Sequence, residues 1–503
     1  MLINDLIKKV SQLKEAGKTV VQSHGVFDLV HPGIIKHLEE AKVRGDVLVV
    51  TVIRDQDVRR GPGRPIFPET MRAGNVASLQ QVDYVSIVEE ATPFECVKMI
   101  KPDIFAKGQA YKERDRKIHE KIYEAEKEFY FGKSTIYETQ GFSFSSSNLI
   151  NSFLDIYPEE IKTFLQKFSK QYSFEQVVNR IETLKKMRVL LIGDGIIDEY
   201  HYCTAMGRSS KTPIVVNKYL THEDFAGAVF IIANHIAGIC EKVHLVTLLG
   251  KKDSREDFIR QNLRPNVQPK FFFREDGPTV IKRRYIDQYR NQKLFEINYL
   301  NEDYINGDCE VGIIDYLKSV VSDYDLVLVS DFGHGFITDR MIKAISRHAK
   351  IFAVNTQTNA ANTGYNMITK YKKPNFVCLD ETEARLATQD KFSDIESIAR
   401  RIVSKINSDF LIVTLGKKGS IGVDNKGEVN YTPIFSTKVV DTVGAGDAFF
   451  AFTAPCFAQG MPLDFVSFVG NAVGALAVQI MGNKKPVEKH ELLEFMHTIL
   501  NQR

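Results

Sequence analysis

The residues best suited to chemistry lie between Val439 and Phe450, a segment that predicts a β-strand, a glycine-rich turn and the start of a buried helix. Gly444, Ala445 and Gly446 carry little or no side chain, so their backbone N–H groups can turn inward together at a helix N-terminus and hold an anion. Asp447 follows directly, where its carboxylate can accept a hydroxyl proton while those N–H groups stabilise charge on a phosphoryl group. This combination predicts the site of a small-molecule kinase.

The same turn also has a structural interpretation. An acidic residue in the first turn of a helix stabilises its N-terminus without any catalytic role. The longer segment Asp441-Thr442-Val443-Gly444-Ala445-Gly446-Asp447, however, resembles the C-terminal signature of the ribokinase-like sugar kinases. The resemblance implies that Asp447 is the catalytic base and that Gly444, Ala445 and Gly446 form the anion hole.

Length and composition limit what can surround this turn. A chain of 503 residues should hold two or three domains. The net charge is +3 without a long block of like charges, which gives no indication of nucleic acid or membrane partners. No apolar run reaches the roughly 18 residues of a membrane span. The six cysteines are scattered without a Cys-x-x-Cys pair, which favours free thiols and a cytoplasmic location.

Three further positions in the second half are candidates for binding the acceptor substrate. Asp198 follows an apolar strand and falls where the sugar kinases hold substrate hydroxyls, although capping of a turn is the structural alternative. Asp331 ends another apolar strand, and open α/β sheets bind ligands at such ends. Lys282 belongs to the basic strand Pro278–Tyr285, which either a phosphorylated sugar or ordinary exposed edge charges would explain.

The resemblance to the sugar kinases extends to the metal and the nucleotide. Cys378–Glu383 resembles the family's Asn-x-x-Glu, which implies that Asp380 and Glu383 organise Mg²⁺ and its waters. The segment Leu411–Gly419 resembles the ATP-side strand and turn. The implied ATP-binding residues are Thr414, Gly416, Gly419 and Asn471.

Gly207–Tyr219 resembles the small β lid that covers the sugar in this family and often pairs subunits, so a homodimer is expected. After it, Phe225–Phe230 stands where the family has Gly-Gly-x-x-Asn. Gly227 remains a substrate-binding candidate, whereas Ala226 and Phe230 replace a glycine and a polar sugar contact. Either the substrate differs from the usual one or the pocket is impaired.

The first 150 residues carry a second candidate site. A strand at Thr19–Ser23 leads into a glycine-containing turn and a helix that begins near Pro32. His31 therefore lies beside exposed helix N–H groups, where a phosphate would bind. A capping histidine in an ordinary α/β unit is the alternative.

This opening resembles the nucleotidyltransferases that carry His-x-Gly-His, and so do Arg64–Arg72, Lys107–Tyr111 and Ser145–Asn148. The resemblance makes His31 catalytic. The nucleotide-binding residues that it implies are Gly25, Phe27, Asp28, Gly33, Arg72, Lys107, Ser145, Ser146 and Ser147.

Two departures from this family bear on catalysis. Ile34 replaces the second motif histidine, and Ala110 replaces the aspartate of the Lys-Gly-x-Asp-Tyr segment. An isoleucine can neither donate to a phosphate nor move a proton. His24 and His37 are near enough in sequence to act as substitutes, although a histidine on a charged helix face is more often solvated.

The sequence predicts an α/β protein: a Rossmann-like nucleotidyltransferase domain at 1–151, a helical connector at 152–187 and a ribokinase-like domain with a β lid at 188–503. The halves together resemble the bifunctional heptose kinase/nucleotidyltransferases of surface-polysaccharide synthesis, with the domain order reversed. This implies a sugar or sugar phosphate, ATP, Mg²⁺ and a second nucleotide, CTP or ATP. Two alternatives remain: a sugar kinase whose first domain only binds nucleotide, and a non-catalytic sensor or scaffold.

Overall fold

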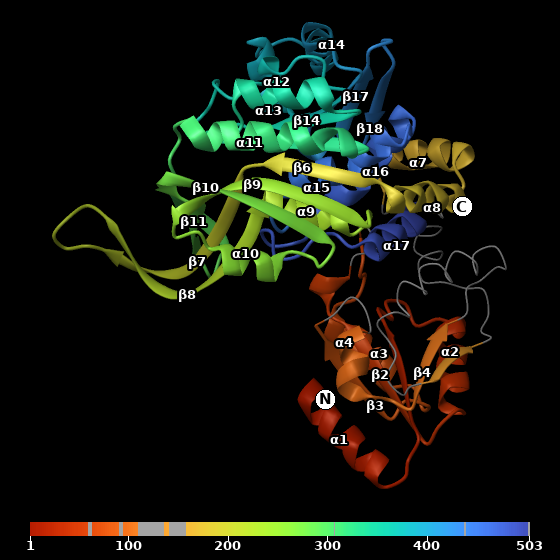
Figure 1. The fold of residues 1–503 in the computed structure, drawn as a ribbon. Helices are drawn as coiled ribbons and strands as arrows, with labels where there is room; N and C mark the ends of the chain where they lie inside the picture. The colour runs from red at the N-terminus through yellow and green to blue at the C-terminus, as the bar shows by residue number, and fades with distance from the viewer. Residues whose placement is uncertain are drawn as a thin grey trace. The chain divides into compact units, whose positions relative to one another are not determined.

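The computed structural model describes residues 1–58, 63–89, 94–108, 135–139, 157–305, 307–436 and 439–500 (Figure 1). The chain forms two compact units, Met1–Val178 with His490–Arg503, and Asn179–Lys489. Helices α7 (Glu159–Gln171) and α8 (Phe174–Thr183) fall within the segment predicted as a helical connector. The domain boundaries remain predictions.

The first unit contains a Rossmann-like sheet of five parallel strands in the order β3-β2-β1-β4-β5. The predicted parallel crossover between its first two strands is confirmed. A ligand site is expected where the strand order reverses, between β1 and β4. The elements are α1 (Ile3–Glu15), β1 (Val20–Gly25), α2 (Pro32–Lys42), β2 (Val47–Ile53), α3 (Glu69–Ala77), β3 (Tyr84–Val88), α4 (Phe94–Ile100), β4 (Ile104–Gly108), β5 (Thr135–Thr139) and the C-terminal α17 (Lys489–Leu500).

The second unit is built on nine strands in the order β10-β9-β6-β13-β14-β15-β16-β17-β18, of which only the β16–β17 and β17–β18 pairs are antiparallel. These strands are β6 (Arg188–Gly193), β9 (Lys242–Lys252), β10 (Val267–Pro278), β13 (Leu326–Asp331), β14 (Phe352–Thr356), β15 (Phe376–Asp380), β16 (Phe410–Thr414), β17 (Ser420–Asp424) and β18 (Val429–Thr432).

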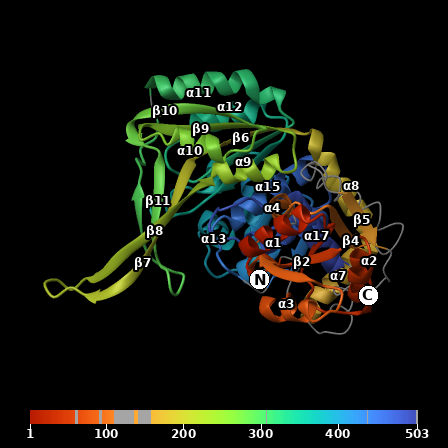
Figure 2. The same ribbon diagram turned by 90° about the horizontal axis from the view of Figure 1, so that it is seen from below.

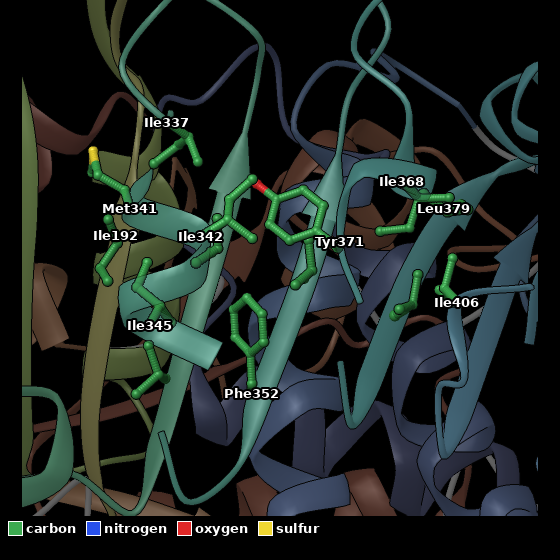
Figure 3. Packing of buried hydrophobic residues seen from close by; sticks show 14 of the residues in the cluster. Ile192, Ile337, Met341, Ile342, Ile345, Phe352, Ile368, Tyr371, Leu379 and Ile406 are labelled. Atoms are coloured by element: carbon green, nitrogen blue, oxygen red, sulfur yellow. The ribbon is translucent and has the colours of Figure 1, made fainter. Parts of the chain in front are cut away.

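Helices cover both faces of this sheet. One face packs against α11 (Gly307–Val320), α12 (Asp339–His348), α13 (Glu381–Thr388) and α14 (Ile395–Ile406) through one large apolar cluster. Figure 3 shows Phe352 and Leu379 of the sheet in this cluster together with Ile345 of α12 and Ile406 of α14. The other face packs against α9 (Val229–Ala237), α15 (Ala445–Ala458) and α16 (Leu463–Ala477). Short α10 (Glu256–Asn262) completes the unit.

A four-stranded sheet, in the order β12-β11-β7-β8, forms the predicted β lid. Its strands are β7 (Gly195–Arg208), β8 (Val215–Ala228), β11 (Val280–Asp287) and β12 (Gln292–Tyr299). Figures 1 and 2 both show the β7–β8 hairpin reaching beyond the helices of its unit. No helix in the described part of the chain is long and apolar enough to cross a membrane.

Candidate active site

The second unit contains a cavity of about 850 Å³ at the ends of its central strands. The cavity brings together residues from distant parts of the chain, such as Asp198 and Asn483, which are 285 positions apart. The predicted site residues that line it are Asp198, Lys282, Asp380, Glu383, Thr414, Gly416, Gly419, Gly444, Ala445, Gly446, Asp447 and Asn471.

The glycine turn opens helix α15 onto this cavity. Gly444 is the N-cap residue with φ of +79°, and a Cβ there would lie 2.1 Å from Oδ1 of Asn483. Only glycine therefore fits this position. A Cβ on Gly446 would meet nothing within 4 Å, so the first turn faces open space. The strand predicted before the turn is wrong: Val439 and Val440 are exposed and lie in no strand, and the Val440 N–H donates instead to the carbonyl of Val478, at the end of α16.

Asp447 lies in the first turn of α15 with only 6% of its surface exposed. Nε2 of Gln357, in the loop after β14, donates a hydrogen bond of 2.6 Å to its Oδ1. Burial raises the pKa of Asp447 to about 7. The Gln357 hydrogen bond lowers this pKa, the negative charge of Asp198 raises it, and the positive charge of Lys282 lowers it. A carboxylate that titrates near neutral pH suits a general base.

Asp198 and Lys282 form the opposite wall on neighbouring lid strands. The Asp198 carboxylate pairs with Arg284 and accepts a hydrogen bond of 2.8 Å from Nδ2 of Asn483. Lys282 is 9% exposed, and burial lowers the pKa of its ammonium group. Its Nζ lies 5.8 Å from the centroid of the Phe332 ring. A buried cation on the cavity wall is stabilised by an anion, which makes this wall suitable for a phosphate.

His334 does not line the cavity but lies close enough to Lys282 for that charge to affect its pKa, and sequence reasoning did not single it out. It is 3% exposed, and neither ring nitrogen has a hydrogen-bond partner among the described residues. Burial, and then the charge of Lys282, lower its pKa to about 3, so the ring is neutral at physiological pH. Buried polar atoms without partners are uncommon and indicate an absent water or ligand. Its position three residues after Asp331 was the available signal.

Two predicted substrate residues do not line the cavity. Asp331 is 1% exposed, and its carboxylate contacts Nζ of Lys370 at 2.6 Å and the Tyr371 hydroxyl at 2.5 Å. A Cβ on Gly227 would lie 2.0 Å from Oδ2 of Asp198, so Gly227 provides the space for that carboxylate. Both residues support the site from behind, and neither is placed to touch a substrate.

Phe230, predicted to alter the sugar contact, is also away from the cavity. Its side chain is fully buried in α9, and its ring fills the space beside Gly195, where a Cβ would meet it at 2.6 Å. The loss of a polar residue at this position therefore leaves the cavity open.

Asp380 and Glu383 form a capping box at the start of α13. Glu383 N–H donates to Oδ1 of Asp380 at 2.7 Å, Asp380 N–H donates to Oε2 of Glu383 at 2.8 Å, and Thr358 N–H donates to Oε1 of Glu383 at 2.9 Å. Burial, and then the nearby Asp380 carboxylate, raise the pKa of Glu383 to about 8. Two adjoining carboxylates facing the cavity fit a hard cation. No group of three or more potential metal ligands exists among the described residues, so water and phosphate oxygens would have to complete its coordination.

The residues predicted to bind ATP lie together along one part of the cavity. Thr414, Gly416 and Gly419 lie at the end of β16 and in the turn after it. Asn471 of α16 also reaches the cavity, but its Nδ2 donates to Oγ of Ser420 at 2.6 Å and to the Ser467 carbonyl at 2.8 Å. Its amide is therefore held by the protein, and it borders the cavity as a fixed wall.

In the first unit, His31 is the N-cap of α2. Its Nδ1 accepts a hydrogen bond of 3.1 Å from Gly33 N–H, and burial lowers its pKa. The capping interpretation therefore describes its geometry, and catalysis by His31 remains a prediction. Gly25 is the last residue of β1, and Phe27 adopts a φ of +52° in the turn between β1 and α2.

Arg72 and Asp28 hold this unit together internally. Arg72 is fully buried, and its guanidinium donates to three carbonyl oxygens and to the Asp55 carboxylate. Asp28 accepts from the backbone N–H groups of Ile66 and Phe67 at 2.8 and 3.0 Å. The prediction that Arg72 contacts a triphosphate does not fit this arrangement, because burial removes its side chain from any ligand.

Ile34 packs against the apolar cluster between α2 and the sheet. The two histidines weighed as its substitutes are engaged elsewhere. His37 lies between the hydroxyls of Ser23 at 2.8 Å and Thr139 at 2.7 Å, and burial lowers its pKa to about 4. His24 contacts Oγ1 of Thr51 at 3.0 Å.

Lys107 lies near the end of β4, beside the point where the strand order reverses. The predicted nucleotide-binding residues Ser145, Ser146 and Ser147, and the replaced aspartate position Ala110, lie outside the described residues.

Models of known protein families match both parts of the chain. The sequence model of the pfkB family carbohydrate kinases matches residues 189–490, and the cytidylyltransferase-like model matches residues 23–152. The chain is also similar in fold to the crystal structure of phosphofructokinase-2 from Escherichia coli in complex with potassium. That comparison gives a TM-score of 0.51 at 14% identity and covers 62% of this chain and 99% of the other.

Two bacterial relatives share the name bifunctional protein HldE. The relative from a Nitratiruptor species is 48% identical over 113 residues, which are 22% of this chain and 24% of that protein. The relative from Shewanella amazonensis is 25% identical over 314 residues, which are 62% of this chain and 64% of that protein. This chain therefore spans less than two thirds of either relative.

Replacing Asp447 should stabilise the protein in a pH-dependent way. The pKa of Asp447 rises from an ordinary 3.8 to about 7 on folding, because the folded protein favours the protonated acid. The stability that this preference adds is fully present below the unfolded pKa and is lost as the pH rises through 7. Asp447→Asn should then raise the thermal unfolding midpoint by roughly 5 °C at pH 8 and change it little at pH 4, measured by calorimetry without ligands. An equal change at both pH values would contradict the raised pKa.

Proposed function

The chain belongs to the pfkB family of carbohydrate kinases, and from this premise we propose that its second unit transfers the γ-phosphoryl group of ATP to a sugar hydroxyl. One observation carries the proposal: Asp447, with a pKa near neutrality, shares a cavity with the open N-terminus of α15 and with Asp198 and Lys282. A base, an anion-binding turn and polar side chains for the acceptor are the parts that phosphoryl transfer needs.

In the proposed reaction the sugar oxygen attacks the γ-phosphorus, a bond forms between them, and the bond from that phosphorus to the ADP oxygen breaks. Asp447 takes the proton of the attacking hydroxyl. The glycine turn from Gly444 to Gly446 stabilises the negative charge on the phosphoryl oxygens in transit. Asp198, fixed by Arg284 and Asn483, orients the acceptor by accepting from its hydroxyl groups.

We further propose that the acceptor already carries a phosphate. Lys282 supplies a buried positive charge on the acceptor side, and the nearby His334 ring has two nitrogens that no described residue hydrogen-bonds. Both features suit phosphate oxygens and hydroxyls. A heptose-like sugar phosphate for surface polysaccharide is consistent with the similarity to the HldE proteins.

Magnesium is the cofactor that this proposal implies. Asp380 and Glu383 would hold the hydrated ion at the edge of the cavity, where it would neutralise charge on the ATP phosphates. The two carboxylates keep lone pairs that the capping box does not use. Binding of a cation there would also relieve the repulsion that raises the pKa of Glu383.

For the first unit we propose binding of a nucleoside triphosphate, CTP or ATP, at the reversal of strand order between β1 and β4. His31, Gly33 and Lys107 flank this position. If the protein is bifunctional, the first unit would join a sugar 1-phosphate to this nucleotide. A specific observation favours a second candidate, a kinase whose first unit binds nucleotide without catalysis: Ile34 is part of an apolar cluster and supplies no donor. The complete cavity of the second unit speaks against a wholly non-catalytic sensor.

We propose that the protein is a cytoplasmic homodimer that associates through the lid. The tip of the β7–β8 hairpin and strand β12 expose large apolar side chains. Those more than 35% exposed include Ile214, Val215, Val216, Tyr219, Leu220, Leu294, Phe295 and Ile297. Single exposed apolar residues are ordinary, but a group on one small sheet is typical of an interaction surface.

The kinase function is tested by ADP release from Mg²⁺–ATP with a panel of sugars and sugar phosphates, including heptose phosphates. We expect turnover with a phosphorylated sugar, and Asp447→Asn should lower it by roughly two to four decades while ATP binding persists. The substitution keeps the size of the side chain and removes its basicity. Full turnover in Asp447→Asn would show that Asp447 is not the base. If the parent protein turned over no member of the panel, the kinase proposal would be wrong.

The magnesium role is tested by titration of the kinase with Mg²⁺. Glu383→Gln keeps the shape of the side chain and removes the negative charge that Glu383 would carry with the ion bound, so it should raise the Mg²⁺ concentration for half-maximal rate several-fold. Glu381→Gln is the matched control, because that carboxylate lies on the same helical turn but is paired with Arg385 at 2.7 Å. Identical titrations of Glu383→Gln and the parent would exclude the role.

The first unit should release pyrophosphate slowly or not at all from CTP or ATP with a sugar 1-phosphate. Loss of one aligned donor typically costs roughly two to three decades in rate, so Ile34→His should raise the release up to about 100-fold. Ile35→His is the control at the adjacent position, and His31→Ala should weaken triphosphate binding. Release by the parent at an ordinary rate, roughly 1 to 1000 per second, would show that another group has replaced the histidine.

A further inference from the structure

Gln357 is the one side chain in the described part of the chain that donates a hydrogen bond to the Asp447 carboxylate. It follows β14 and lines the same cavity. The donor–acceptor distance of 2.6 Å is short for N–H···O, as expected when the acceptor is charged. Because a carboxylate only accepts, the contact fixes which atom of the amide faces Asp447.

The backbone around Gln357 is held firmly. Its N–H donates to the Asp331 carbonyl at 2.8 Å, and its own carbonyl accepts from Nδ2 of Asn366 at 3.2 Å. Asp331 is in turn held by Lys370 and Tyr371. Asp331 therefore helps to hold the backbone that presents the Gln357 amide to Asp447, although Asp331 itself does not line the cavity.

Resting on the proposed kinase function, we infer that Gln357 is the positioning residue of the reaction: it binds Oδ1 of Asp447 and leaves Oδ2 to accept the proton of the acceptor hydroxyl. A carboxylate has two oxygens, and a hydrogen bond to one fixes the rotation of the whole group. The proton then passes to the oxygen that faces the cavity. The hydrogen bond also stabilises the charged form, against the desolvation that burial imposes.

Several other charged or titratable groups act on Asp447 and would remain in any Gln357 variant. Asp198 of β7 and Lys282 of β11 act on it from the lid, with opposite effects on its pKa. Glu383 of α13 and Cys378 of β15 are close enough for Asp447 to raise their own pKa values. Gln357 carries no charge, so its replacement by leucine changes one hydrogen bond and no charge.

The test is the pH profile of kcat/KM for Gln357→Leu. Without the donor, the acid limb of the profile should move up by about one pH unit, because the charged form of the base loses a hydrogen bond. Turnover at pH 7 should fall about fivefold and largely recover by pH 9, with the KM for ATP little changed. Gln357→Glu keeps the size and should move the limb at least as far, because a second carboxylate repels the first.

Asn359→Ala is the matched control. Asn359 lies in the same loop and donates to the Phe332 carbonyl at 2.8 Å, so this variant loosens the loop and leaves the Gln357 amide in place. It should lower turnover equally at every pH. A profile for Gln357→Leu that falls uniformly like that of Asn359→Ala, with no movement of the acid limb, would overturn the positioning role.

A second measurement needs no turnover and separates this inference from the kinase proposal. The difference in thermal unfolding midpoint between pH 5 and pH 8 should be larger in Gln357→Leu than in the parent, and this excess should vanish when Asp447→Asn is added. An excess that persists beside Asp447→Asn would overturn the inference. If the parent turns over no sugar, the kinase proposal fails, and the unfolding comparison still decides whether Gln357 acts on Asp447.

Discussion

The structure depends on the burial of one carboxylate, Asp447, at the N-terminus of a buried helix. Burial of a charge is costly, and here it raises the pKa of the acid to about 7. The site offsets part of the cost with the helix N-terminus, the Gln357 amide and the charge of Lys282. The protein thus gives up stability in order to hold a buried carboxylate that titrates near neutral pH.

Much of the second unit positions the surroundings of this acid. The doubly wound sheet ends its central strands at one edge, and helices on both faces hold these ends in place. The lid sheet contributes Asp198 and Lys282 from neighbouring strands in direct register. Gly444 and Gly227 help to position the site because they have no side chain. A Cβ on Gly444 would clash with Asn483, and a Cβ on Gly227 would clash with Asp198. Small changes in packing would therefore reach the site through these contacts.

In the first unit, polar side chains of the kinds that often act in catalysis stabilise the fold instead. Arg72 and Asp28 satisfy backbone groups of the turns around β1, and His31 caps α2. Buried backbone N–H and C=O groups must be paired, and these side chains pair them. Phosphate-binding turns require this same support, so a residue can belong to a nucleotide-binding motif and still act by shaping the turn. The apolar packing of Ile34 favours a binding role for this unit.

The sequence by itself determined the α/β class, the two-part organisation and the residues Asp447, Asp198 and Gly444, because apolar periodicity and short glycine turns are local properties of the chain. Only the tertiary structure decided that Asp331 and Gly227 stand behind the site, that Arg72 is buried, and that Gln357 lines the cavity. Gln357 and Asp447 are 90 residues apart, and no local pattern records their contact. Which atoms of a polar side chain remain available to a ligand depends on partners from distant strands and loops, and packing alone brings these together.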